Sequence, residues 1–203
     1  MAINPERQAL PRYGSPISEQ EYEALERAYP ELRLELIGGR LYYNLAGGSR
    51  AHATICLNIS AELRSQLKRG SGPCFVVGSD MQVLANGEKV YPDVTISCDV
   101  SDHKQDIKII QSPHIVVEVH SPSTEYKDKN HKLQAYMACS TIEEIMFVNQ
   151  FAPEVRVCSR SGGEWRSQDY QRGQLLHLAS LDLQLSMDEI YYDIEFEEPL
   201  EES

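Results

Sequence analysis

The strongest strand signal in the chain is Pro113-His114-Ile115-Val116-Val117-Glu118-Val119-His120, which carries a carboxylate near its centre. Its β-branched and mostly apolar composition is typical of a strand in the interior of a sheet. A helical pattern follows over about residues 127–138, and Glu144-Ile145-Met146-Phe147-Val148 has the composition of another strand. Residues 114–148 therefore predict a β-α-β unit.

Patterns on both sides of this unit predict further helices and strands. The capping box Ser18-Glu19-Gln20-Glu21 predicts a helix that ends near residue 28. Apolar residues at i+4 spacing from Ile55 to Leu67 predict a second helix, for which Gly70 is the stop signal. Short strands are expected at 32–36, 41–43, 74–77, 81–84, 94–98, 155–157, 164–166 and 175–178. Two-residue turns are expected at Gly38-Gly39 and Asn86-Gly87. This mixture predicts an α/β fold of the mixed-sheet (α+β) kind with a strand-rich C-terminal half.

The length and composition indicate a globular protein. The chain has 203 residues, of which 41% are hydrophobic and 25% charged, which excludes wholesale disorder. We expect an N-terminal arm over 1–16, a single domain over 17–192 and an acidic tail over 193–203. No apolar run approaches the roughly 18 residues of a membrane span, and the N-terminus lacks the apolar region of a secretory signal. The expected compartment is the cytoplasm.

The charge balance is acidic, with 19 Lys and Arg against 31 Asp and Glu and a formal net charge of −12. Six of the acidic residues lie in the tail, so residues 1–192 carry a net charge of −6. Proteins that bind nucleic acid are usually basic, and the balance therefore weakens a nucleic-acid function without excluding it. The tail itself is expected to be a solvated end of the chain.

The cysteines show no ligand spacing. They are Cys56, Cys74, Cys98, Cys139 and Cys158. Because no C-x-x-C pair occurs, neither a zinc knuckle nor a thioredoxin-type motif is supported. Five scattered thiols fit a reducing compartment and small buried side chains.

Two carboxylates are candidates for a shared site. Because side chains alternate along a strand, Glu118 shares its face with His120 in a strand that is otherwise apolar. A buried Glu is costly unless it is paired or binds a metal, so a lysine partner or an edge strand are the alternatives to a functional role. Asp93 follows Pro92 at the start of a strand, although Pro-Asp is also a common turn pair. If the two strands are neighbours, the carboxylates form a site suited to Mg²⁺ or Mn²⁺.

The order Pro92-Asp93 and then Glu118 in an apolar strand resembles the PD-(D/E)xK nuclease pattern. The run over 113–124 resembles, more specifically, the Uma-type family of restriction endonucleases, a former domain of unknown function. Further residues that match this family are Asp128, Lys132, Tyr136 and the stretches 34–42 and 49–53. The resemblance spans about residues 20–192 and implies a restriction-endonuclease-like core with flanking helices.

The resemblance also implies roles for individual residues. Asp93 and Glu118 would be catalytic and hold Mg²⁺ or Mn²⁺, with the main-chain carbonyl of Val119 as a further ligand. Two residues after the Glu, where the superfamily has lysine, this chain has His120. The Uma-type family carries a lysine on the following helix, which corresponds to Lys132. Lys132 is therefore the third expected catalytic residue, and the alternative is a solvated helix lysine.

Three more positions are weaker candidates. Glu35 corresponds to an acidic position of the family and is a candidate third carboxylate, although its place between two leucines also fits a solvent-facing residue. His120 is an additional candidate because it shares the strand face of Glu118. His52 corresponds to the family's helix-start histidine, and a residue on the helix surface would explain it equally well.

These residues favour a metal-dependent endonuclease that hydrolyses phosphodiester bonds in DNA. The ion would activate a water, and Lys132 would position that water or stabilise the developing negative charge. The alternative is a catalytically inactive binding or regulatory module on the same fold, which the acidic balance favours. DNA is the expected partner despite the acidic surface, no membrane partner is expected, and a homodimer is an open alternative.

Overall fold

The computed structural model describes residues 9–43, 48–70, 72–120 and 126–196, with the backbone alone for 126–130. These residues form the helices α1 Glu19–Ala28, α2 Arg50–Arg69, α3 Tyr126–Ala138 and α4 Met187–Ile190 and the short 3-10 helix η1 Val100–His103. The strands are β1 Ser15–Pro16, β2 Leu34–Ile37, β3 Arg40–Tyr43, β4 Phe75–Gly78, β5 Gln82–Ala85, β6 Glu88–Val90, β7 Val94–Ser97, β8 Ile109–Ile110, β9 Pro113–His120, β10 Glu144–Asn149, β11 Glu154–Ser161, β12 Glu164–Gln171, β13 Leu175–Leu178 and β14 Leu183–Ser186. The run 121–124, the side chain of Asp128, residues 1–8 of the arm and residues 197–203 of the tail lie outside this description.

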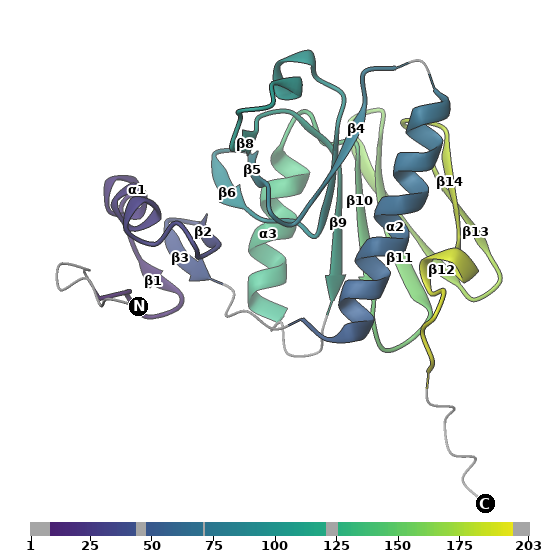
Figure 1. The fold of residues 1–203 in the computed structure, drawn as a ribbon, viewed down its shortest axis with the longest axis horizontal. Helices are drawn as coiled ribbons and strands as arrows, with labels where there is room; N and C mark the ends of the chain where they lie inside the picture. The colour runs from purple at the N-terminus through teal and green to yellow at the C-terminus, as the bar shows by residue number, and fades with distance from the viewer. Residues whose placement is uncertain (1–8, 44–47, 71, 121–125, 197–203) are drawn as a thin grey trace, which may run out of the picture.

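The strands form two mixed six-stranded sheets and one separate hairpin. The first sheet has the order β1-β3-β2-β6-β5-β8, the second has the order β12-β11-β10-β9-β7-β4, and β13 pairs with β14. In the second sheet, β9 is an interior strand that runs parallel to β10 and antiparallel to β7. The predicted β-α-β unit is thus confirmed as β9-α3-β10, and Figure 1 shows α3 beside these strands.

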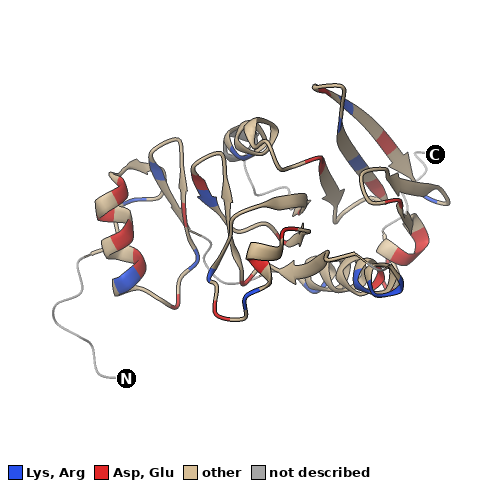
Figure 2. Ribbon diagram, turned by 90° about the horizontal axis from the view of Figure 1, so that it is seen from above, with Lys and Arg blue, Asp and Glu red and all other residues tan. Residues whose placement is uncertain are grey.

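Alternate residues of β9 pack into two apolar cores on opposite faces of the second sheet. Ile115, Val117 and Val119 pack in one core with the apolar residues Ile55, Ile59 and Leu63 of α2. Val116 packs in the other core with Tyr136 of α3 and with residues of the first sheet. Figure 2 shows α2 and α3 on opposite sides of the second sheet. Glu118 has the parity of Val116 and so belongs to the face that α3 covers.

Local signals in the N-terminal half are confirmed. Ser18 caps α1, and both hydrogen bonds of the capping box to Glu21 are present. The β2–β3 hairpin turns at Gly38 and Gly39, whose φ angles are 58° and 68°. Such left-handed backbone favours glycine, which explains why two glycines stand at this turn. The stretch expected to be an arm ends in β1, which pairs with β3.

The expectation of free thiols is wrong for two of the five cysteines. Cys74 and Cys98 form a disulfide that links the ends of β4 and β7. Phe75 and Ser97 are paired in the antiparallel ladder, so the next residue outward on each strand is the cysteine. A sequence separation of 24 residues hides this pairing, and the inference of a reducing compartment loses the support of these two thiols.

The C-terminal half holds longer strands than expected. β11 and β12 are eight-residue strands that form one antiparallel hairpin. Most of β12 is exposed, so its sequence lacks the apolar alternation from which its length could be predicted. α3 ends at Ala138, as the helical pattern over about residues 127–138 predicts. Within the described ranges, no helix has the length and apolarity needed to cross a membrane.

Candidate functional site

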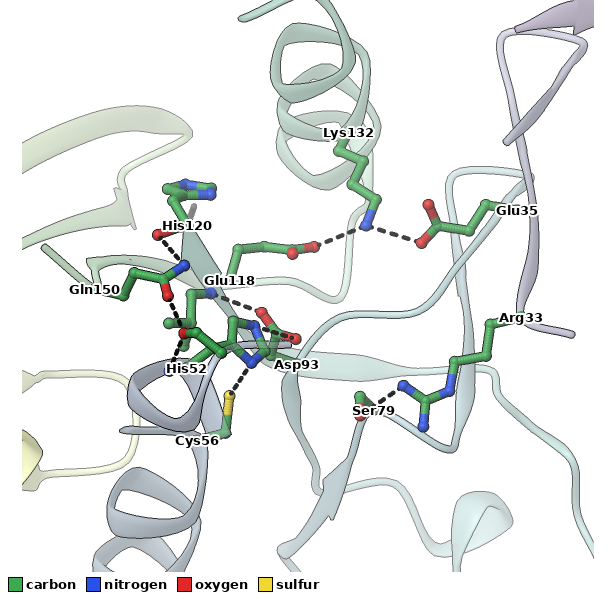
Figure 3. A network of polar contacts seen from close by, with 12 residues as sticks. Arg33, Glu35, His52, Cys56, Ser79, Asp93, Glu118, His120, Lys132 and Gln150 are labelled. Carbon is green, nitrogen blue, oxygen red and sulfur yellow. Dashed lines mark hydrogen bonds and ion pairs between the residues drawn. The ribbon is translucent and has the colours of Figure 1, made fainter. Parts of the chain in front are cut away.

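The pairing of β7 with β9 brings Asp93 and Glu118 together. Val94 pairs with Val117, so the antiparallel register, extended by one residue, places Asp93 opposite Glu118. The backbone N–H of Asp93 donates to the carbonyl of Val117 at 3.1 Å. The N–H of Val119 donates to Oδ2 of Asp93 at 2.7 Å, which fixes that side chain on β9. Figure 3 shows the two acidic side chains at the same end of the strand.

Glu118 is held by two side chains of α3. The hydroxyl of Tyr136 donates to Oε1 of Glu118 at 2.6 Å, and Nζ of Lys132 lies 3.3 Å from the same oxygen. Lys132 and Tyr136 are four residues apart and therefore share a face of the helix. β9 is an interior strand, so burying a charged Glu118 there would be costly without a partner. The ion pair with Lys132 offsets this cost. The edge-strand explanation for Glu118 is thereby excluded, whereas the other alternative, a lysine partner, is confirmed.

Glu35 of β2 joins the same lysine from the first sheet. Nζ of Lys132 lies 2.8 Å from Oε1 of Glu35, and that oxygen also accepts a hydrogen bond from the N–H of Tyr91 at 2.7 Å. Only 4% of Glu35 is exposed, so it is not the solvent-facing residue that its leucine neighbours allowed. Lys132 in turn is not a solvated helix lysine, because it bridges the carboxylates of Glu35 and Glu118 and its side chain is only 17% exposed.

The proximity of these charges alters their protonation. Burial raises the pKa of Glu118 to about 7, with Asp93 and Glu35 acting in the same direction and Lys132 and Tyr136 opposing them. Burial alone would lower the pKa of Lys132, but the carboxylates of Glu118 and Glu35 outweigh it and raise the pKa above the ordinary value. The ammonium is therefore a permanent charge, whereas Glu118 titrates near neutrality.

A second group of side chains contacts Asp93 from the start of α2. Nε2 of His52 lies 3.2 Å from Oδ1 of Asp93, and Nδ1 of His52 lies 3.7 Å from Sγ of Cys56. The hydrogen bond to Asp93 raises the pKa of His52, although burial acts in the opposite direction. Cys56 has no role in the expectations from the sequence. The signal that could have found it is its i+4 spacing from His52 on a helix that begins close to the candidate site.

His120 shares the strand face of Glu118 and contacts the neighbouring strand β10. Its ring stacks on Phe147 with ring centroids 5.1 Å apart, and its carbonyl accepts a hydrogen bond from the Gln150 side chain. The imidazole lines a groove of about 610 Å³ over β10, β11 and β12, whereas Glu118 points toward Lys132. Of the six residues considered from the sequence, Glu35, Asp93, Glu118 and Lys132 lie together. His52 contacts Asp93, and the ring of His120 lies against Phe147.

The fold has a counterpart among solved structures. In this protein a mixed sheet lies between two helices, with Asp93 and Glu118 on neighbouring strands and Lys132 beside them. The same fold is found in the crystal structure of "a putative nuclease belonging to DUF820" from Anabaena variabilis, with a TM-score of 0.66 and 14% identity over 79% of this chain and 90% of that one.

The sequence comparisons identify the family. The Uma2 family, described as "Putative restriction endonuclease", matches residues 19–188, and the chain belongs to this family. It is also 30% identical, over 183 residues, to an uncharacterized protein of Synechocystis sp., a match that covers 89% of this chain and 94% of that protein.

Proposed function

We propose that this protein is a divalent-metal-dependent endonuclease that hydrolyses phosphodiester bonds in DNA, with Asp93, Glu118 and Lys132 as its catalytic residues. The observation that carries the proposal is the buried Glu118 carboxylate, held opposite Asp93 and bound to the Lys132 ammonium in the interior of a sheet. Family membership agrees with this class of activity.

The donor set fits Mg²⁺ or Mn²⁺. Asp93 and Glu118 supply carboxylate oxygens, and the carbonyl of Val119 is proposed as a further ligand, all of which suit hard cations. The contacts of the Glu118 carboxylate with Lys132 and Tyr136 both use Oε1, so Oε2 is the oxygen proposed for the ion. Burial also makes the pKa of Glu118 higher than usual, and a bound cation would favour its charged form.

When bound, the ion supplies Lewis-acid chemistry, because it lowers the pKa of a water and neutralises charge on the scissile phosphate. Lys132 is proposed to stabilise the negative charge that develops in the transition state. Glu35 and Glu118 hold its ammonium in place, and Tyr136 orients Glu118 through the hydroxyl hydrogen bond.

The second candidate is a catalytically inactive binding or regulatory module on the same fold. The observation that favours it is the engagement of Lys132 by two carboxylates, together with a net charge of −12. A lysine neutralised by Glu35 and Glu118 has less charge to offer a phosphate. The two candidates differ in turnover but share the metal site.

The test measures cleavage of supercoiled plasmid and Mn²⁺ binding by calorimetry on the same preparations. We expect cleavage that needs Mg²⁺ or Mn²⁺ and stops with chelator. Asp93→Asn should abolish both cleavage and Mn²⁺ binding. Lys132→Ala should remove most of the cleavage while Mn²⁺ binding persists, and the exposed Lys104→Ala is the matched control.

His120→Ala tests whether His120 or Lys132 takes the place of the lysine that the superfamily carries two residues after the Glu. Its imidazole stacks on Phe147 away from Glu118, so this variant should cost much less activity than Lys132→Ala. The opposite ranking would make His120 the working residue. Mn²⁺ binding without cleavage in the wild type would favour the inactive module, and chelator-resistant cleavage would refute the metal mechanism.

A further inference from the structure

The first two turns of α2 direct a nitrogen and a sulfur donor at Asp93. One ligand atom from each of His52, Cys56 and Asp93 can be chosen so that all three lie within 4.8 Å of one another. His52 and Cys56 come from one face of the helix, and Asp93 comes from the start of β7, so two separate elements supply the cluster (Figure 3).

Cys56 differs from the other thiols in what surrounds it. The free cysteines among the described residues are Cys56, Cys139 and Cys158, because Cys74 and Cys98 are bonded to each other. Cys139 and Cys158 are buried in the apolar core under α3. Cys56 is half-buried and is the free thiol whose sulfur contacts an imidazole that itself contacts a carboxylate.

A carboxylate–imidazole–thiol chain could instead indicate a cysteine nucleophile. The electrostatics oppose that role, because burial and the nearby carboxylates of Asp93 and Glu118 raise the pKa of the Cys56 thiol. A nucleophilic cysteine needs the opposite shift, toward the thiolate at neutral pH. The same negative surroundings that disfavour a thiolate favour a cation placed between the donors.

We propose that His52, Cys56 and Asp93 form a metal position of their own, which takes Zn²⁺ through one nitrogen, one sulfur and one oxygen donor. This mixed donor set suits a borderline ion such as Zn²⁺ better than Mg²⁺. The position shares Asp93 with the oxygen site described above. It stands whether or not the protein cleaves DNA, because His52 and Cys56 have no part in the nuclease proposal.

The distances are compatible with coordination after small side-chain movements. In a tetrahedral zinc site, donors on one ion lie roughly 3.3–3.6 Å apart, which follows from Zn–N, Zn–O and Zn–S bonds of about 2.0–2.3 Å. His52 already lies 3.2 Å from Asp93 and 3.7 Å from Cys56, although through different ring nitrogens. One ring nitrogen suffices for coordination, and one atom from each residue already lies within 4.8 Å of the others, so side-chain rotation has to shorten the longest of these separations.

The backbone around the donors is already fixed. The side chain of Ser49 caps α2 by accepting a hydrogen bond from the N–H of His52 at 3.0 Å. Oδ2 of Asp93 is held by the N–H of Val119, which leaves Oδ1 on the side of His52.

On binding, the Cys56 thiol loses its proton to water and the thiolate becomes the ligand. Three protein ligands leave a fourth position for water, as in zinc sites that are not purely structural.

Cobalt is the probe of choice, because Co²⁺ occupies zinc sites and a thiolate ligand gives it an intense near-ultraviolet charge-transfer band. We expect wild-type protein to develop this band on titration with Co²⁺ and to lose it when Zn²⁺ is added. Cys56→Ser should lack the band and bind Zn²⁺ about 100-fold more weakly by calorimetry. Cys139→Ser is the matched control and should behave as the wild type does.

Glu118→Gln separates this position from the oxygen site. It should weaken Mn²⁺ binding yet keep the Co²⁺ band, whereas Cys56→Ser should keep Mn²⁺ binding and lose the band. If Cys56→Ser does not fold, as judged by circular dichroism, His52→Gln should show the same loss of Zn²⁺ affinity. A folded wild type without the band, or a band that survives in Cys56→Ser, would overturn the proposal.

Discussion

Glu118 places a carboxylate on a strand in which Ile115, Val116, Val117 and Val119 pack into apolar cores. Its side chain is only 12% exposed, and Lys132 at 3.3 Å is the nearby positive charge that offsets this burial. The pKa of Glu118 is nevertheless raised to about 7, because burial outweighs the lysine. Small changes at Lys132 should therefore be visible in the titration of Glu118.

We predict that Lys132→Met raises the pKa of Glu118 further, since it removes the main influence that lowers it. Carbon-13 NMR of the labelled carboxyl groups measures both titrations directly. The wild-type carboxyl should titrate near 7, and the variant at least about one unit higher. A wild-type midpoint near that of a solvent-exposed glutamate would show that the contacts with α3 do not hold in solution.

The raised pKa of Glu118 in the wild-type protein also affects the stability of the fold. Between about pH 4.5 and 7 the folded state holds a proton on Glu118 that the unfolded state has released. The free energy of unfolding therefore falls as pH rises through this window, by roughly 3 kcal/mol at most for this group. Glu118→Gln removes that pH-dependent contribution, so the difference between variant and wild type identifies it.

The sequence revealed some residues of the site and not others. Asp93 and Glu118 stand out because each is a carboxylate at a defined place in a strand pattern. Glu35 was visible only as a family match, because its burial depends on the contact of β2 with α3 through Lys132. Cys56 was missed because its contact partner His52 reaches the site through Asp93, which lies 37 positions from Cys56, and because no spacing among the five cysteines sets it apart.

At the scale of elements, the β2–β3 hairpin carries Glu35 to the site. Its two-residue turn needs left-handed backbone at both positions, with φ 68° at Gly39. The turn fixes the register Ile37↔Arg40, and register in turn decides which face Glu35 occupies. The turn was predictable from Gly-Gly alone, since few other residues adopt this backbone.

We predict that Gly39→Ala destabilises the protein by about 1 kcal/mol, because an L-residue is strained at this φ. A β-carbon at Gly39 would meet no atom within 4 Å, so steric contact adds nothing to the cost. Urea unfolding gives the change. Gly72→Ala is the control, because Gly72 has the same open surroundings without left-handed backbone, and it should be neutral or slightly stabilising.

The disulfide between Cys74 and Cys98 acts on β4 and β7, and β7 begins next to Asp93. Closing a chain separation of 24 residues should stabilise the folded state by about 3 kcal/mol in the loop-entropy view. Unfolding in the presence and absence of a phosphine reductant measures this difference. The double variant Cys74→Ala/Cys98→Ala should match the reduced protein and be insensitive to reductant. Equal stability of the oxidised and reduced wild type would contradict the expectation.

At the scale of the whole molecule, the candidate site lies where separate units meet. Glu35 comes from the first sheet, Asp93 and Glu118 from the second, Lys132 from α3 and His52 from α2. Periodicity and turn residues predicted most of these elements, since each is a local pattern. How the two sheets pack against one another is a long-range property of the chain. The meeting of these side chains could therefore be proposed from the family resemblance, whereas local sequence patterns alone do not predict it.

Net charge is the remaining property of the molecule as a whole that bears on a DNA substrate. The chain carries −12, and Figure 2 shows Lys and Arg scattered over several elements among acidic residues. A phosphate backbone is therefore repelled at long range, and few counterions should be released on binding. A divalent ion at Asp93 and Glu118 would reverse the local sign of the charge, so that attraction depends on the ion.

We therefore predict that affinity for a labelled DNA duplex, measured by fluorescence anisotropy at low salt, is at least about tenfold higher with Ca²⁺ than with chelator. Ca²⁺ is chosen because it binds carboxylates while allowing the complex to be measured without cleavage. Asp93→Asn should lose most of this gain, because it removes a shared ligand. Asp182→Asn is the control, because the Asp182 side chain is 91% exposed and lies outside the site. This variant should retain the dependence of DNA affinity on Ca²⁺. The affinity should also fall only weakly with added salt, because few counterions should be released by a chain with a net charge of −12. Tight binding in chelator with a steep salt dependence would instead show that a basic surface, and not the metal site, recognises the nucleic acid.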